Sequence, residues 1–236
     1  TELVEVLSGG NLMIMLILVA IICLVLGMGL PTTANYIVVS TLMAPVIVEL
    51  GAQTGLLVPL IAVHMFVFYF GLMADVTPPV GLASYAAAGI AKSEPMLTGL
   101  TAFGYSARTA ILPFMFIFNT QLLLIGIDNT FQLILTIITA TVASMMFAAA
   151  TQGFFIAKSR LHESALLLLV TFTLFRPGFW MDMMYPPYEE IPPTELTRLV
   201  EEAPRNGNLR VWVEGMNLEG QDISKGVLLP LGNKAE

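Results

Sequence analysis

The chain has 236 residues, of which 56% are hydrophobic and 11% are charged, and its mean hydropathy is +0.82. Soluble domains carry about 25% charged residues, so this composition excludes an ordinary soluble protein and indicates an integral membrane protein. The net charge of −7 lies mostly beyond Pro177, where 10 acidic and 5 basic residues contribute −5 and indicate an aqueous tail. The one cysteine, Cys23, excludes a disulfide framework, and no Cys/His metal spacing is present.

A helical hairpin is predicted over residues 11–50. The apolar run Leu12 to Leu26 is interrupted by Gly27, Gly29 and Pro31, and a second run covers Tyr36 to Val48. Each run is shorter than the roughly 20 residues that a spanning helix needs. We therefore expect a hairpin that enters the membrane, turns near its middle and leaves on the same side, with Thr32 and Thr33 capping the second helix. The alternative is a plain kinked spanning helix.

A broken helix is predicted over residues 55–91. The apolar segment Gly55 to Met73 stops at Asp75, where Thr77-Pro78-Pro79-Val80-Gly81 follows. Consecutive prolines end a helix, and Pro79 suits the first position of the next one. The second half, Val80 to Ala91, is too short to span alone. The alternative is a loop joining two ordinary helices.

The remaining membrane segments are longer and less interrupted. Residues 96–107 are predicted to lie at the interface, residues 109–127 and 131–157 to span, and residues 163–176 to form a short interfacial helix. Residues 1–176 are thus predicted to be a membrane transport domain and residues 177–236 a small soluble α+β tail. In the tail, Thr194 to Ala203 has a helical pattern, and two segments, 209–214 and 226–231, resemble strands.

Loop charges predict the orientation. Glu2, Glu5, Glu49 and Asp128 are expected on one side, and Lys92, Arg108, Lys158 and Arg160 on the other. Because basic loops favour the cytoplasm, the hairpin is predicted to dip in from outside and the tail to be cytoplasmic.

The two breaks carry the predicted chemistry. At a break, one half-helix ends in unpaired carbonyls and the other begins with free amides. Carbonyls of this kind coordinate sodium, and amides hold anionic groups. The candidate ion- and substrate-binding residues are Gly27, Gly29, Thr32, Thr33, Asn35, Asp75, Val76, Thr77, Pro78, Pro79 and Gly81. Backbone or hydroxyl oxygens of Gly27, Gly29 and Thr77 are the candidate sodium ligands.

Isolated polar residues leave alternatives open. His64 is interpreted as a proton carrier or, more simply, as half of a hydrogen bond between helices. Asp75 is either a gate or ion-site carboxylate or a residue facing a water-filled cavity. Asn119 and Gln121 are expected to hold helices together.

The motifs Gly27-Met-Gly-Leu-Pro-Thr-Thr-Ala-Asn-Tyr36, Phe66-Val-Phe-Tyr-Phe-Gly71 and Thr77-Pro-Pro-Val-Gly81 resemble the large membrane subunit of TRAP transporters, the tripartite ATP-independent periplasmic transporters of bacteria and archaea. The fused type, in which small and large subunits share one polypeptide, is the more similar. The resemblance covers about residues 9–177. It implies an all-α elevator-type transporter built of inverted repeats, of which only the second repeat is present here. The chain is therefore expected to be the carboxyl-terminal part of a longer permease.

The resemblance also implies a function and partners. It implies sodium-driven import of organic anions, with Na⁺ as coupling ion and no covalent cofactor, in the cytoplasmic (inner) membrane. The implied partners are a periplasmic solute-binding protein, a small membrane subunit and the lipid bilayer, and no nucleic acid. Two alternatives remain, an intramembrane hydrolase and a non-transporting scaffold subunit. The hydrolase lacks a second carboxylate facing Asp75, a Gly-x-Ser-x partner for His64 and a His-Glu-x-x-His motif. An enzyme is therefore not expected.

Overall fold

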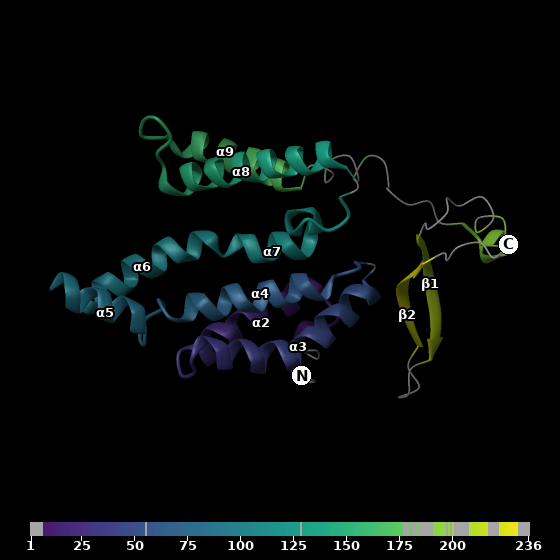
Figure 1. The fold of residues 1–236 in the computed structure, drawn as a ribbon, viewed down its shortest axis with the longest axis horizontal. Coiled ribbons are helices and arrows are strands. Elements are labelled where there is room, and N and C mark those ends of the chain that lie inside the picture. The colour runs from purple at the N-terminus through teal and green to yellow at the C-terminus, as the bar shows by residue number, and fades with distance from the viewer. Residues whose placement is uncertain are drawn as a thin grey trace.

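The computed structural model describes residues 7–54, 56–127, 129–176, 180, 184, 191–196, 198, 200, 208–216 and 222–230. Within these ranges the chain is mostly helical, with one pair of strands near the carboxyl end (Figure 1). The helices are α2 (Leu12–Gly27), α3 (Thr32–Gln53), α4 (Leu60–Ala74), α5 (Leu82–Ala91), α6 (Pro95–Thr109), α7 (Ile111–Phe118), α8 (Thr130–Gln152) and α9 (Leu161–Phe175). Two short 3-10 helices, η1 (Thr120–Leu123) and η2 (Pro193–Glu195), complete the helical set.

The larger core lies between α2, α3 and α4, which all contact one another, and α7 packs on α4. Phe66 of α4 is fully buried, and its ring meets Phe70 of the same helix and Phe114 of α7 at centroid distances of 4.9 Å and 5.1 Å. These aromatic contacts attach α7 to the three-helix group. A smaller core joins α7, α8 and α9 around Met115, Ala143 and Phe175.

Side-chain caps explain where several helices begin. Asn11 accepts hydrogen bonds from the amides of Met13 and Ile14 at the start of α2, and Asn129 accepts one from Gln132 at the start of α8. Glu94 caps α6 in the same way. Each cap satisfies amides that would otherwise lack acceptors in the first turn.

Three helical segments are long and apolar enough to cross a membrane among the described residues: α3, the stretch 95–118 formed by α6 and α7, and α8. With 22 residues, α3 is longer than the second apolar run that the sequence suggested. It extends about 33 Å at 1.5 Å per residue. Its length alone is therefore enough to cross.

The helix predicted over residues 109–127 begins and ends at different residues in the structure. The helical stretch begins at Pro95 and ends at Phe118, because Asn119 takes extended angles (φ −138°, ψ 92°) and its side chain accepts a hydrogen bond from the amide of Gln121. Arg108, which the sequence placed in a loop, lies inside this stretch with its guanidinium over the ring of Tyr105. Likewise, α8 ends at Gln152 and not at residue 157.

Both predicted strands are confirmed. β1 (Asn208–Met216) and β2 (Asp222–Pro230) pair antiparallel, with Val211 opposite Val227 and Trp212 opposite Gly226. Of the helix predicted over 194–203, the structure describes η2 and isolated residues only, and the rest lies outside the described residues. β2 contacts α3. Figure 1 shows the strands at the end of the molecule opposite the α5–α6 and α8–α9 connections, where Lys92 and Lys158 lie. The sequence placed the tail and these lysines together.

Candidate functional site

The first break separates α2 from α3 at residues 28–31. The amides of Gly29 and Leu30 both donate to the carbonyl of Leu26, which tightens the last turn of α2. Pro31 stands four residues after Gly27 and has no N–H, so the Gly27 carbonyl cannot receive the usual helical hydrogen bond. The prediction that the chain breaks here is confirmed, and the break leaves a carbonyl oxygen of α2 available.

The amino end of α3 has no side-chain cap. Its N-cap is Pro31, and no side-chain hydrogen bond reaches the first turn, so the expectation that Thr32 and Thr33 cap this helix is wrong. A proline at this position has no side-chain acceptor to offer, and Thr32 and Thr33 lie one and two residues beyond the N-cap, inside the helix. The first helical amide bond runs from Asn35 to the carbonyl of Pro31. The first-turn amides of α3 therefore have no intrahelical acceptor.

The second break separates α4 from α5 at residues 75–81, and its own chain satisfies most of its carbonyls. The Asp75 carbonyl accepts from the amide of Ala83 at 3.2 Å, the Val76 carbonyl from the Ser84 hydroxyl at 3.3 Å, and the Thr77 carbonyl from the amide of Gly81 at 3.1 Å. Gly81 has φ +22°, which a residue with a side chain rarely adopts. This break is a closed turn, in contrast to the first one.

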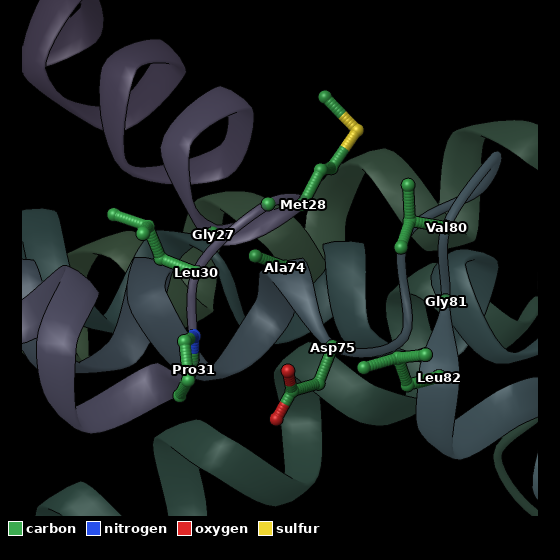
Figure 2. Close-up of a pocket in the computed structure, with 10 residues that line it drawn as sticks. Gly27, Met28, Leu30, Pro31, Ala74, Asp75, Val80, Gly81 and Leu82 are labelled. Atoms are coloured by element: carbon green, nitrogen blue, oxygen red, sulfur yellow. The ribbon is translucent and has the colours of Figure 1, made fainter.

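The two breaks lie against a common hollow of about 220 Å³. Figure 2 shows the α2–α3 turn on one side and the α4–α5 turn on the other, with Ala74 and Asp75 between them. Forty-odd residues of chain separate the two turns. The hollow is lined by Gly27, Met28, Gly29, Leu30, Pro31, Ala74, Asp75, Val80, Gly81 and Leu82.

Asp75 is the one ionisable residue that lines the hollow. It is the C-cap of α4, so its carboxylate stands at the partially negative end of that helix. The carboxyl end of α2 faces the same hollow through Gly27 and Met28. Two negative helix ends and a carboxylate are mutually unfavourable unless a cation or water offsets them. The amino ends of α3 and α5 also border the hollow, at Pro31 and Leu82, and can attract an anionic group.

Gly27 allows the close approach of three helices behind the hollow. A β-carbon placed on Gly27 would stand 2.3 Å from the β-carbon of Ala74 and 2.6 Å from Nδ2 of Asn35. Gly29 has only the Leu26 carbonyl nearby, at 3.9 Å. The two glycines of the motif therefore have different roles, and only Gly27 is required by packing.

Asn35 lies behind the hollow and is 1% exposed. Its Nδ2 donates to the carbonyl of Cys23 at 2.9 Å, and this bond fixes the orientation of the amide. Its Oδ1 is buried without a hydrogen-bond partner. Buried acceptors without a partner are rare and costly, so this oxygen is a candidate ligand for a cation or a water molecule.

The predicted site residues divide into two groups. Gly27, Gly29, Asp75 and Gly81 line the hollow, while Thr32, Thr33, Asn35, Val76, Thr77, Pro78 and Pro79 do not. The Thr77 hydroxyl donates to the carbonyl of Met73 at 2.6 Å. The ring of Pro78 faces Gly99 of α6, and the Pro79 carbonyl accepts from the Tyr85 hydroxyl at 2.5 Å. Most of these residues hold the two turns in shape.

Six lining residues lie outside the candidate set: Met28, Leu30, Pro31, Ala74, Val80 and Leu82, although the carbonyls of residues 27–30 and the helix start at Val80 were expected to face the site. All of them are immediate chain neighbours of predicted residues. They were omitted because apolar side chains carry no binding signal in a membrane sequence, although their position at a break could have identified them.

The polar contacts of the remaining helices support structural roles. His64 of α4 lies 2.9 Å from the hydroxyl of Tyr36 of α3, measured at Nδ1. Asn119 donates through Nδ2 to the carbonyl of Phe175, which joins α7 to α9. Within the described part of the chain, no group of three or more His, Cys, Asp or Glu residues could hold a metal ion.

Comparison with known families agrees with this geometry. The family described as "Tripartite ATP-independent periplasmic transporter, DctM component" matches residues 1–131, more than half of the chain, and includes both breaks. Residues 133–236 match a domain of unknown function, DUF3394, which comprises most of α8, α9 and the strand pair. No curated protein and no solved structure gives a significant match. The chain is thus a multi-pass membrane protein that belongs to the DctM family of tripartite ATP-independent periplasmic transporter permeases.

Proposed function

We propose that this permease couples the inward movement of sodium to the import of a small organic anion, a carboxylate, which a periplasmic solute-binding protein delivers. A small membrane subunit, separate or fused, completes the transporter in the cytoplasmic membrane. Membership of the DctM family supports transport as the function. The observation that supports the coupled mechanism is the meeting of two helix breaks at one hollow that contains a single carboxylate.

The α2–α3 pair fits a re-entrant hairpin in this proposal. Its turn lies beside the break between α4 and α5. In this proposal α4 and α5 would be the two halves of one membrane crossing. A turn beside such a break would lie at intermediate depth. Irregular backbone at that depth is stable only where protein covers it or where it lines a wet cavity, and the hollow at this turn would meet that requirement.

Sodium would bind at the negative side of the hollow. The Asp75 carboxylate, the free Gly27 carbonyl and the carbonyls of the α2–α3 turn are all oxygens, and Oδ1 of Asn35 lies behind them without a partner. Half-helix carboxyl ends with unwound carbonyls are the usual sodium ligands of broken-helix transporters. Thr77 lies in the adjoining α4–α5 turn and not in the lining, and its hydroxyl, which donates to Met73, keeps lone pairs that would accept a cation.

The anionic substrate would bind at the positive side. Pro31 before α3 and Leu82 at the start of α5 border the hollow, and the uncapped amides of α3 follow Pro31 directly. Carboxylates bind to such helix ends through amides and the helix dipole. At about 220 Å³ the hollow is smaller than the roughly 300–1,000 Å³ of complete ligand pockets. The hollow would therefore hold only the carboxylate end of a substrate. Other parts of the transporter would enclose the rest.

Replacement of Asp75 by Asn tests this proposal. The permease with its partner subunits is reconstituted in vesicles, and uptake is measured as a function of sodium concentration in the presence of the binding protein. Asp75→Asn removes the charge and preserves the shape, so the half-saturating sodium concentration should rise about tenfold or more, which corresponds to about 1.4 kcal/mol. Glu49→Gln at the far end of α3 is the matched control and should leave it unchanged.

Two results would contradict the proposal. Uptake by the unaltered protein that does not depend on a sodium gradient would remove the coupling ion. Equal sodium dependence in Asp75→Asn and the unaltered protein would remove Asp75 from the site. A scaffold subunit, the remaining alternative, would show no uptake under any condition.

A further inference from the structure

The side of the membrane on which the tail lies can be inferred from the arrangement of the helices. Lys92 ends the path through α4 and α5, and Lys158 and Arg160 lie between α8 and α9. In Figure 1 these two connections lie at one end of the long axis, and β1 and β2 lie at the other. The basic connections and the strand pair therefore lie at opposite ends of the helices.

The end of α9 supports the same separation through a direct contact. The side-chain amide of Asn119 donates to the carbonyl of Phe175, the last residue of α9, and the Phe175 side chain is buried with Met115 and Ala143. Asn119 follows the helical stretch that starts at Pro95, next to Lys92. This stretch has 24 residues, or about 36 Å at 1.5 Å per residue. The chain that leaves α9 therefore starts far from Lys92.

The strands continue this path. β2 contacts α3, and Figure 1 shows it beside the end of α3 that leads to α4. That end carries Glu49, and the hairpin formed by α2 and α3 begins and ends there. Glu214 and Ser224 lie opposite each other in the strand pair and are both exposed, as are Trp212 and Met216 of β1. The strand pair belongs to the charged tail and lies against the end of α3.

Charge then assigns the two sides. Lysines and arginines in short connections favour the cytoplasm, whereas acidic residues such as Glu94 and Glu163 at the same end contribute little. The end of the helices that holds the α5–α6 and α8–α9 connections carries three basic residues, Lys92, Lys158 and Arg160. At the opposite end, the basic residue next to the helices is Arg176. Because three basic residues lie at the first end and one at the second, the α5–α6 and α8–α9 connections are assigned to the cytoplasm.

We propose that the tail of this permease is an extracytoplasmic module that docks on α3 through β2. This assignment replaces the cytoplasmic tail that the sequence suggested. The sequence predicted a short interfacial helix over residues 163–176, whereas α9 packs along α8 and returns toward the opposite end. The inference depends on the fold and on loop charge. It does not depend on sodium coupling or on the substrate.

Cysteine labelling tests the placement, because Cys23 is the one cysteine of the chain and is fully buried. In a Cys23→Ala background of the complete permease, Ser224→Cys places a thiol in the tail and Ser93→Cys places one beside Lys92. Both serines are exposed, so the two variants are matched. Spheroplasts are treated with a membrane-impermeant maleimide before and after permeabilisation. Alkaline phosphatase, which is active only outside the cytoplasm, is fused after Leu231 or after Ser93 as an independent measurement.

The expected result is labelling of Ser224→Cys in intact spheroplasts, with labelling of Ser93→Cys only after permeabilisation, and an active phosphatase only after Leu231. Labelling of both thiols in intact spheroplasts, or of Ser93→Cys alone, would overturn the proposal. If Ser224→Cys is unreactive even after permeabilisation, the phosphatase fusions decide. Inactive phosphatase after Leu231 would then overturn it.

Discussion

Asn35 of α3 donates a hydrogen bond of 2.9 Å from Nδ2 to the main-chain carbonyl of Cys23 in α2. This bond spans the turn at residues 28–31 and joins the first turns of α3 to the last turns of α2. It holds the two helix ends beside the hollow and fixes Oδ1 of the same amide as a buried acceptor. The shape of the first break therefore depends on a side chain that does not line the cavity.

Replacement of Asn35 by Asp should destabilise the protein. Asp has nearly the same shape but no N–H, so the bond to Cys23 is lost and two acceptors face each other in a buried place. The loss of a buried hydrogen bond with an unsatisfied group costs about 1–3 kcal/mol. The measurement is the midpoint of thermal unfolding in detergent. Thr33→Val, at an exposed position of the same turn, is the control and should unfold near the temperature of the unaltered protein. Equal midpoints for all three proteins would show that the bond contributes nothing.

Replacement of Gly27 by Ala should be harmful, and replacement of Gly29 by Ala should be tolerated. The new β-carbon at residue 27 would lie 2.3 Å from that of Ala74, so α2 and α4 must separate. Overpacking of this kind costs about 1–3 kcal/mol. At residue 29 the nearest atom is 3.9 Å away. The midpoint temperature of thermal unfolding and the rate of sodium-dependent uptake should both fall for Gly27→Ala and not for Gly29→Ala. A stable, active Gly27→Ala protein would contradict the close packing seen here.

Local sequence signals were sufficient for the breaks and the strands. Pro31 and the Pro78–Pro79 pair act on their own chain neighbours, because a missing N–H removes a bond only a few residues away. Strand β1 was visible as alternation of apolar and polar residues over 209–214, and β2 as a short apolar segment over 226–231, and both signals depend on near neighbours. Features of this kind need no knowledge of what packs against them.

Contacts between distant residues could not be predicted in the same way. The helix 95–118 ends where it does because Asn119 leaves the helix and bonds to Phe175, which is 56 residues away. Arg108 suggested a loop, since a charge within a span is unfavourable, but its side chain lies over the ring of Tyr105. The meeting of the two breaks at one hollow likewise depends on how α2 packs on α4. These relationships exist only in the folded chain.

The contact between Tyr36 and His64 predicts a structural role for the histidine. The hydroxyl of Tyr36 lies 2.9 Å from Nδ1 of His64, so each side chain satisfies the other between α3 and α4. Tyr36→Phe should lower stability by about 1 kcal/mol and preserve sodium-driven uptake. Tyr69→Phe is the control, because the Tyr69 ring packs on Phe116 of α7 and its substitution retains that contact. His64→Asn should behave as Tyr36→Phe does. Complete loss of uptake in a stable His64→Asn protein would instead indicate a proton carrier.

The hydroxyl of Thr77 predicts a difference between serine and valine at this position. Thr77 donates to the carbonyl of Met73 at 2.6 Å, as Thr101 does to Leu97 at 2.8 Å on an exposed face of α6. Thr101→Val therefore removes an equivalent bond far from the hollow and controls for the loss of that bond. If the Thr77 oxygen also coordinates sodium, Thr77→Val should raise the half-saturating sodium concentration about tenfold, or about 1.4 kcal/mol. Thr77→Ser and Thr101→Val should retain the original value. Since both Val variants lose the same hydrogen bond, equal sodium dependence in the two would limit Thr77 to holding the α4–α5 turn and would leave Asp75 and the α2 carbonyls as the ion ligands.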